Sequence, residues 1–267
     1  MNKGYVILAQ NTYEIDYISC AEALALSMKQ VMPDASITLI SNNKSDCLAF
    51  DKIVPLPYGD LDPHSGWKLS NDWQVYEASP YEYTIKLEAD MIIPTNIDYY
   101  WDALKHKDLV VSTNIRNYKG EIVKDVYYRQ FIINNQLPNC YNALTYFRKS
   151  ELAKQFFEVV KDIFENWEQY KLILKCKSTE EVSTDWAYSI ACHILGEEKT
   201  TMTTYDSFSM VHMKQMVNEL FTDDWTKELV TEFTENGFRL NTFVQKHPFH
   251  YHVKDFSKVV KKNVGRV

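Results

Sequence analysis

The chain has 267 residues, of which 45% are hydrophobic and 14% aromatic, and it carries a net charge of −7. This is the composition of an ordinary globular protein, and 7 Gly and 8 Pro leave little room for disordered linkers. The negative charge argues against general electrostatic attraction to DNA, although it is compatible with a local basic patch.

The cysteines and the apolar runs of the sequence indicate the cellular compartment in which the protein is expected. The five cysteines are scattered and contain no C-x-x-C pair, which argues against a zinc ribbon or a disulfide framework and favours a reducing cytoplasm. The amino-terminal apolar run is too short for a signal peptide, and no stretch approaches the roughly 20 apolar residues of a membrane span. We therefore expect a cytoplasmic protein with no membrane partner.

Strands and helices alternate in the amino-terminal part of the chain. The pattern predicts a strand at 4–10, a helix from Ile18 that ends at Pro33, strands at 36–41 and 52–56, a helix at 66–79 and a strand at 84–87. This alternation indicates a mostly parallel sheet with helices on both faces. Ligands of such sheets bind at the carboxyl ends of the strands.

The later part of the chain shows a mixed pattern with no internal repeat or linker, so we expect one domain. The predicted elements are a strand at 108–113, a hairpin turn around Gly120, a strand at 142–147, a long helix capped by Ser150, a helix from about Ser183, a strand at 209–212 and a helix at 223–235.

Two carboxylates, Glu88 and Asp90, stand where the apolar strand 84–87 ends and just before the apolar residues 91–93. Charges are seldom left in such a place unless something positive neutralises them, and a metal ion is the candidate. The alternative interpretation is a strand end exposed to solvent.

Seven segments, in this order along most of the chain, resemble GT-A glycosyltransferases, especially the group that contains glycogenin and the lipopolysaccharide galactosyltransferases. The segments are ILAQNTYEIDYISCAEALALSMKQ, SITLISNN, GWKLSNDW, TIKLEADMIIPTNID, CYNALTYFRKS, STDWAYSIAC and SMVHMK. Three features depart from the pattern of that group. Glu88 replaces the usual first Asp, Leu144 stands where Gly is usual, and HMKQM lacks the usual Gly and Pro-Trp.

The resemblance implies a single α/β domain of the GT-A, Rossmann-like fold over residues 1–267, with a mixed, mostly parallel central sheet. Residues 1–94 would form the nucleotide-binding half, and residues 95–267 the acceptor-side half and the carboxyl-terminal tail. It also implies metal-dependent transfer of a sugar from a nucleoside-diphosphate sugar, UDP-sugar being expected, to a hydroxyl group with retention at the anomeric carbon. The expected cofactor is Mn²⁺ or Mg²⁺.

The same resemblance assigns the metal site. Asp90 would be the principal ligand with Glu88 beside it, His212 would be the third protein ligand, and Lys214 would contact the departing phosphate. A lone His is more often a core or surface residue than a ligand. His250 and His252 are competitors, because their alternation places them on one face of an extended segment. His252 followed by Lys254 also repeats the spacing of His212 and Lys214, and we rank His212 first and His252 second.

The resemblance assigns donor binding to Ala9, Asn11, Tyr13, Asp16, Lys68, Glu88, Ala89 and Lys214. It further implies that Asn142 bonds a sugar hydroxyl and that Asp185 orients the acceptor or stabilises positive charge at the anomeric carbon. Simpler interpretations exist for several of these residues: Asn11 can cap a helix, Lys68 can be a solvated helix residue, and Asp185 can cap its own helix.

Two other function classes and the acceptor stay open. A nucleotidyltransferase that makes nucleotide sugars would carry a Gly-rich loop, which the first strand lacks, and a non-catalytic carbohydrate- or partner-binding module would use aromatic residues for stacking.

The acceptor is a saccharide, a protein or a modified DNA base. The richness of the sequence in Asn, Lys, Tyr and Ile resembles that of phage open reading frames. A phage protein would act in the host cytoplasm, and its acceptor could then be a hydroxymethylated pyrimidine of phage DNA. The cations for DNA would be Arg116, Lys119, Lys124, Arg129 and the tail 258–266, offset between 116 and 129 by Glu121 and Asp125.

Overall fold

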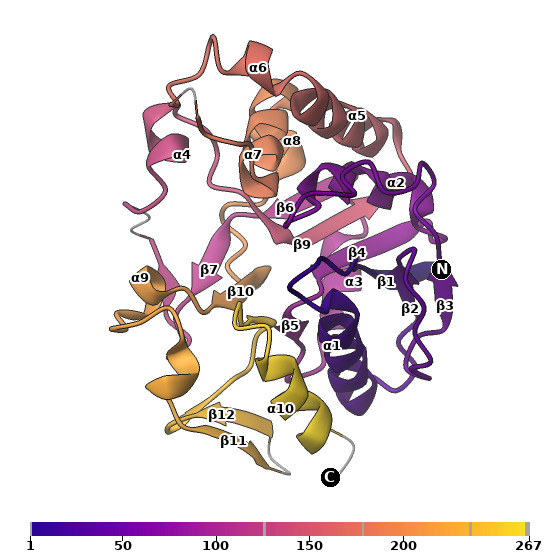
Figure 1. The fold of residues 1–267 in the computed structure, drawn as a ribbon, viewed down its shortest axis with the longest axis vertical. Helices are drawn as coiled ribbons and strands as arrows, with labels where there is room; N and C mark the ends of the chain where they lie inside the picture. Colours follow the sequence, from indigo (N-terminus) through magenta and orange to yellow (C-terminus); the bar gives the residue numbers. More distant parts are fainter. Residues whose placement is uncertain (1, 125–126, 178, 235–236, 265–267) are drawn as a thin grey trace.

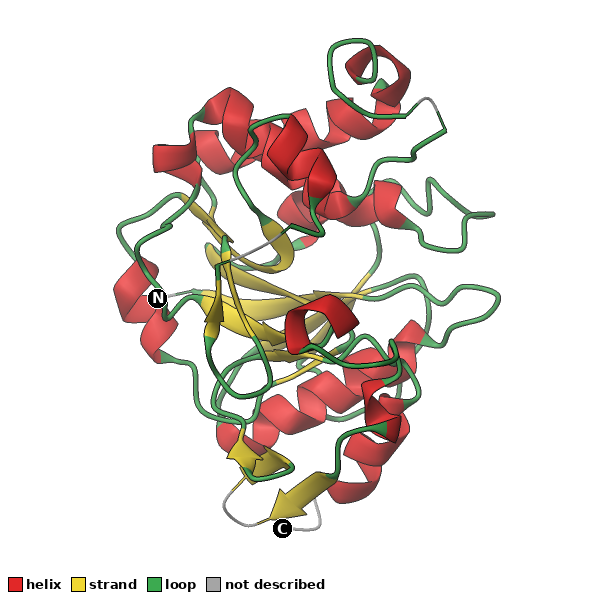
Figure 2. Cartoon of the chain, turned by 90° about the vertical axis from the view of Figure 1, so that its left-hand side faces the viewer, coloured by secondary structure: helices red, strands yellow, loops and turns green. Residues whose placement is uncertain are grey.

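A computed structural model describes residues 2–124, 127–177, 179–234 and 237–264. The main sheet lies between two layers of helices (Figure 2). Within the described ranges, none of the helices combines the length and the apolar character that crossing a membrane requires.

The central sheet has six strands in the order β3-β2-β1-β4-β9-β6. The first four are parallel to one another, whereas β9 runs antiparallel to both of its neighbours. The predicted mixed, mostly parallel sheet is therefore confirmed. The strands are β1 (Lys3–Leu8), β2 (Ile37–Ile40), β3 (Lys52–Val54), β4 (Tyr83–Glu88), β6 (Leu109–Ser112) and β9 (Tyr141–Arg148).

Three long helices cover the two faces of this sheet (Figure 1). On one face, α1 packs Leu24 into the same core as Ile7 of β1. On the other face, α5 packs Phe156 against the cluster that contains Phe147 of β9, and α7 adds Tyr188. Burying these faces stabilises the layers at about 25 cal/mol per Å² of apolar surface. The helices are α1 (Tyr17–Val31), α5 (Glu151–Glu165) and α7 (Thr184–Leu195).

Short helices connect the layers. They are η1 (Leu69–Gln74), α2 (Val75–Ala78), α3 (Tyr99–Leu104), α4 (Gln130–Asn134), α6 (Trp167–Tyr170), α8 (Glu197–Thr200), α9 (Gln215–Asn218), η2 (Trp225–Lys227) and α10 (Phe256–Asn263).

A second sheet of five strands has the order β5-β14-β10-β7-β8. Because β5 follows β4 after only two residues, Ala89 and Asp90 form the crossover from the first sheet to the second. β14 pairs with β5 on one side and with β10 on the other, so that His250 lies beside both Met91 and His212. The strands are β5 (Met91–Ile92), β7 (Asn114–Arg116), β8 (Ile122–Val123), β10 (Ser209–His212) and β14 (Phe249–His250); β11 (Thr231–Thr234), β12 (Gly237–Leu240) and β13 (Phe243–Val244) form a third sheet.

Two helix predictions are wrong in part. The segment predicted as a helix at 223–235 forms only the short η2 and then β11, which pairs with β12; Glu235 lies outside the described residues. Burial of Trp225, whose indole donates a 2.7 Å hydrogen bond to the Tyr251 carbonyl, and the β-branched residues that follow favour this outcome over a helix. The helix predicted at 66–79 begins only at Leu69, because Lys68 has a left-handed backbone with φ of 53°.

Candidate active site

A cleft of about 670 Å³ opens where the carboxyl ends of β1 and β4 meet the second sheet. Many of the residues that the sequence singled out lie in its wall. They are Ala9, Lys68, Glu88, Ala89, Asp90, Asn142, Asp185, His212, Lys214 and His252. The cleft is therefore the candidate active site.

The two acids meet a histidine that the sequence had ranked below His212 and His252. The Nε2 atom of His250 lies 3.1 Å from Glu88 Oε2 and 3.1 Å from Asp90 Oδ2. Lys254 forms an ion pair with the same oxygen of Asp90, and its ammonium group lies over the ring of Tyr17. In the described structure, side-chain cations thus neutralise the acidic pair.

The charged groups at this centre lie close enough to shift one another's pKa values. Burial alone would raise the pKa of the Asp90 carboxyl, but His250 and Lys254 outweigh burial and hold this pKa well below its usual range. Burial alone would lower the pKa of His250, but Asp90 and Glu88 reverse this effect and raise it. Burial raises the pKa of Glu88, and the opposing effect of His250 is smaller. Of the two carboxyl groups, Asp90 is therefore the one that ionises more readily.

The spacing of these ligand atoms suits a divalent cation. One ligand atom from each of Glu88, Asp90 and His250 lies within 4.8 Å of the other two. An octahedral ion with bonds of about 2.0–2.2 Å places adjacent ligands roughly 2.8–3.1 Å apart, which matches the two 3.1 Å distances. These three residues could hold Mg²⁺ or Mn²⁺ once Lys254 moves away from Asp90.

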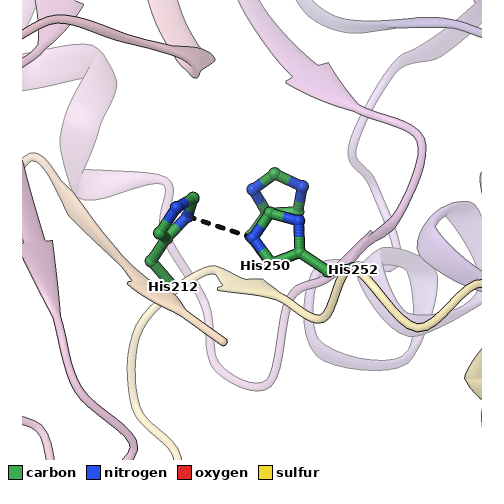
Figure 3. A group of neighbouring side chains, drawn as sticks. All are labelled: His212, His250 and His252. Carbon is green, nitrogen blue, oxygen red and sulfur yellow. Dashed lines mark hydrogen bonds between the residues drawn. The ribbon is translucent and has the colours of Figure 1, made fainter. Parts of the chain in front are cut away.

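His212 and His252 form a second, adjacent contact (Figure 3). His212 ends β10 and is buried, and its Nδ1 atom lies 3.3 Å from His252 Nε2. Burial lowers the pKa of both imidazoles well below the usual value, which favours their neutral forms. His250 and His252 do lie together, with ring centroids 3.8 Å apart, but not on one extended face as predicted. The strand ends at His250, and a left-handed backbone at His252 brings the second ring back over the first.

The predicted donor-binding loop makes capping contacts within the protein. The Asn11 side chain accepts a 2.9 Å hydrogen bond from the Ile18 amide, and Asp16 is the N-cap of α1, accepting from the Ser19 amide at 3.0 Å. Tyr13 is fully exposed. None of these three predicted residues is among the described residues that line the cleft. Capping was the simpler interpretation of Asn11, and it applies to Asp16 as well.

Lys68 lines the cleft, but its ammonium group is engaged elsewhere. It lies 2.5 Å from Asp60 Oδ2 and donates to the Asp62 and Pro63 carbonyls at 3.1 and 3.2 Å. The side chain therefore fixes the loop that precedes η1, and any contact with a donor molecule would require it to leave Asp60.

The opposite wall is organised around Asp185, in the first turn of α7. Its Oδ1 atom accepts a 2.9 Å hydrogen bond from the Asn142 backbone amide, and its Oδ2 atom accepts one from Arg129 Nη2 at 3.2 Å. Arg129 also lies 4.2 Å from the centroid of the Tyr141 ring and donates to the Cys140 carbonyl at 2.9 Å. Its other terminal nitrogen, Nη1, is buried without a partner among the described residues. Arg129, which the sequence offered only as a DNA contact, is thus a component of the cleft.

A buried ion pair beneath the cleft was not predicted. Lys86 of β4 is 1% exposed, and its ammonium nitrogen lies 2.6 Å from Asp72 Oδ1. The Tyr188 hydroxyl donates to the other Asp72 oxygen at 2.6 Å, and Asp72 and Lys86 both line the cleft. The available signal was a single Lys in an otherwise apolar strand, because a buried Lys needs an anionic partner.

Several of the cations proposed for DNA are engaged in contacts within the protein. Arg116 donates to Ser209 Oγ at 2.9 Å and to the Gly120 and Asp206 carbonyls at 2.7 and 3.0 Å, and Arg129 is buried in the cleft wall. Lys119 and Lys124 remain exposed beside the predicted turn, which is formed by β7 and β8. In the tail, Lys258 pairs with Asp255 at 2.6 Å and Lys261 with Glu22 at 3.1 Å; Asp125 and Arg266 lie outside the described residues.

No family model matches the chain, and no curated protein matches it significantly. Solved structures do resemble it. The galactosyltransferase LgtC, in complex with donor and acceptor sugar analogs, is 12% identical, with a TM-score of 0.56 and coverage of 99% of this chain and 97% of that one. The glycosyltransferase GlyE of Streptococcus pneumoniae TIGR4 is 10% identical, with a TM-score of 0.53 and 99% of this chain covered. The bifunctional glycosyltransferase WbbM is 10% identical, with a TM-score of 0.52 over the whole of this chain.

These similarities confirm the predicted α/β fold of the GT-A type. The chain spans 61% of the length of GlyE and 50% of WbbM, whereas it spans nearly all of LgtC. At these identities the shared property is the fold, and the activity has to be argued from the cleft itself.

Proposed function

We propose that this chain is a metal-dependent glycosyltransferase, which moves a sugar from a nucleoside-diphosphate sugar, UDP-sugar being the expected donor, to a hydroxyl acceptor. The observation that carries the proposal is the convergence of Glu88, Asp90 and His250 at the crossover between the two sheets. The fold, which places this centre at the carboxyl ends of parallel strands, supports it.

Glu88, Asp90 and His250 would hold the cation, Mn²⁺ or Mg²⁺, which neutralises the charge that develops on the departing diphosphate. Lys254 pairs with Asp90 in the described structure, and this ammonium group is well placed to turn to a phosphate oxygen when a cation takes Asp90. Lys214, at the amino end of α9, is exposed at the rim of the cleft and offers a second charged contact to phosphate.

During transfer, the bond between the anomeric carbon and the diphosphate oxygen breaks, and its electron pair leaves with the diphosphate. The acceptor oxygen then bonds to the anomeric carbon, and its proton passes to an oxygen of the departing diphosphate. We assign Asp185 to stabilise the positive charge that develops on the sugar, because Arg129 and the Asn142 amide hold its carboxylate in a fixed orientation at the cleft wall. Retention at the anomeric carbon is the expected stereochemistry, and NMR of the product tests it.

We propose a saccharide as the acceptor. Trp67 is 64% exposed and lines the cleft together with Trp186, whose ring stacks on Phe131 with centroids 3.9 Å apart. Such rings offer apolar faces on which sugars pack. A DNA acceptor has less support, because Arg116 and Arg129 are committed to contacts within the protein.

The test is calorimetric titration of UDP in the presence and absence of Mn²⁺, followed by a screen of UDP-sugar hydrolysis. We expect UDP binding to require Mn²⁺ in the native chain, and we expect Asp90→Asn to lose both this Mn²⁺-dependent binding and turnover. Asp102→Asn is the matched control, because the Asp102 side chain is 88% exposed.

Metal-independent UDP binding would contradict the assignment of the centre. Metal-dependent binding without turnover of any donor would favour a binding module over an enzyme.

A further inference from the structure

Three histidines gather beside the carboxylate centre (Figure 3). His212 comes from the end of β10, whereas His250 and His252 come from β14 and the turn that follows it. One ring nitrogen from each lies within 4.8 Å of the other two, and all three rings are largely shielded from solvent. His250 is 160 positions from Asp90 in the sequence, and His212 comes from a different strand than His250. The fold therefore brings the three histidines together.

The spacing of the nitrogen atoms suits a small tetrahedral ion. His212 Nδ1 and His252 Nε2 are 3.3 Å apart. An ion with metal–nitrogen bonds of about 2.0–2.1 Å in tetrahedral geometry places its ligands roughly 3.3–3.4 Å apart, so the separation of these two nitrogen atoms matches that of two zinc ligands.

A hydrogen bond between the two neutral rings explains this 3.3 Å contact equally well, but it leaves two observations without a cause. The Nδ1 atom of His250 is buried without a hydrogen-bond partner among the described residues. His252 adopts a left-handed backbone, with φ of 58°, which is unfavourable for a residue with a side chain and holds its ring against that of His250. Both observations point to a ligand that the three rings bind together.

We propose that His212, His250 and His252 form a second cation site, which binds Zn²⁺ in preference to Mg²⁺ or Mn²⁺. Three imidazoles without a carboxylate form a donor set that suits zinc and similar transition-metal ions, whereas Mg²⁺ prefers a set dominated by oxygen ligands. The fourth position of the ion would face the cleft, which the three residues help to line.

Sharing His250 couples this site to the carboxylate centre. His250 Nε2 contacts both Glu88 and Asp90, and a neutral imidazole ligates one ion at a time. Zinc bound by the three histidines through His250 Nδ1 leaves Nε2 protonated, so His250 cannot also ligate an ion at Glu88 and Asp90, and the two ions exclude each other. This coupling rests on the proposed function, whereas the zinc site itself does not.

The experiment is titration of Zn²⁺ into tag-free protein, with Co²⁺ absorption spectra to distinguish nitrogen from thiolate ligands. We expect one bound ion in the native chain. Loss of an outer partner typically weakens metal binding by 10–100-fold, so His212→Ala and His252→Ala should each weaken it by roughly 100-fold or more. His106→Ala is the matched control, because His106 is exposed. Circular dichroism of each variant, and of His212→Gln and His252→Gln, verifies the fold.

Asp90→Asn separates the two sites, since it should keep Zn²⁺ binding while losing Mn²⁺-dependent binding of UDP. In the native chain, one equivalent of Zn²⁺ should raise the Mn²⁺ concentration needed for UDP binding by tenfold or more. The zinc site is overturned if the native chain binds no Zn²⁺, if binding is unaffected by both His→Ala variants, or if the Co²⁺ spectrum shows thiolate ligands. Simultaneous binding of both ions would overturn the coupling.

Discussion

The buried pair of Lys86 and Asp72 gives the sharpest test of how the floor of the cleft is stabilised. The Lys86 side chain is 1% exposed and that of Asp72 8%, and their charged atoms lie 2.6 Å apart. Replacing Lys86 by Met keeps most of the apolar length of the side chain but leaves the Asp72 carboxylate buried, with the Tyr188 hydroxyl as its one remaining side-chain donor among the described residues. Removing one partner of a buried pair typically costs roughly 3–5 kcal/mol of unfolding free energy. We therefore expect Lys86→Met to lower the melting temperature by roughly 6–20 °C.

Urea unfolding followed by circular dichroism measures this loss. Lys154→Met is the matched control, because Lys154 pairs with Glu158 at 3.7 Å on the exposed face of α5 and should contribute less than about 1 kcal/mol. The double variant Lys86→Met with Asp72→Asn should recover much of the loss, since it leaves no buried charge. A cost for Lys86→Met no larger than that of the control would refute the reasoning, because it would mean that water reaches the pair.

Two further predictions concern pH and the cleft wall. Burial and the nearby Arg116 lower the pKa of His247 to about 4, so the unfolded chain takes up a proton on this ring that the folded chain rejects. Stability should therefore fall as the pH decreases from about 6.5 to about 4, and urea midpoints of His247→Asn should fall less over this range; equal slopes would contradict this. Arg129→Lys cannot keep both the Asp185 contact and the stacking on Tyr141, so we expect kcat to fall roughly 10–100-fold with the melting temperature nearly unchanged. Unaltered steady-state kinetics would exclude this role.

Local features of the structure could be read from the sequence. Ser150 is the N-cap of α5 as predicted, and β10 coincides with the predicted strand 209–212. The helix α7 begins beside Ser183 as predicted, although Ser183 rather than Asp185 is its N-cap. These features depend on a few neighbouring residues, so a short window contains the physical cause. The helix predicted at 223–235 does not form, because the conformation of this segment depends on a distant contact, the hydrogen bond from Trp225 to the Tyr251 carbonyl. A short window of sequence does not contain that cause.

The composition of the site could be predicted only in part. The acidic pair, Asp185 and Asn142 were named from the sequence, and the structure places them all in one cleft. The histidine that contacts the acids could not be chosen in advance, because His212 and His250 end adjacent parallel strands in the same register. What separates them is the pairing of β14 with β5, which puts His250 rather than His212 next to the motif. His250 thereby contacts Asp90, 160 residues away in sequence.

The crossover between the sheets explains why two carboxylates interrupt an otherwise buried stretch. β4 must leave the first sheet after Glu88, and β5 must begin the second sheet at Met91, so the intervening backbone cannot complete a ladder on both sides. The Asp90 carbonyl accepts a hydrogen bond from the Tyr251 amide at 3.1 Å, which continues the pairing with β14 and fixes the position of the carboxylate. The same segment, just after β14, supplies Lys254, while His250 ends the strand itself. The strand that satisfies the backbone at the crossover is therefore also the one that brings the positive charges, and both requirements are met by a single register.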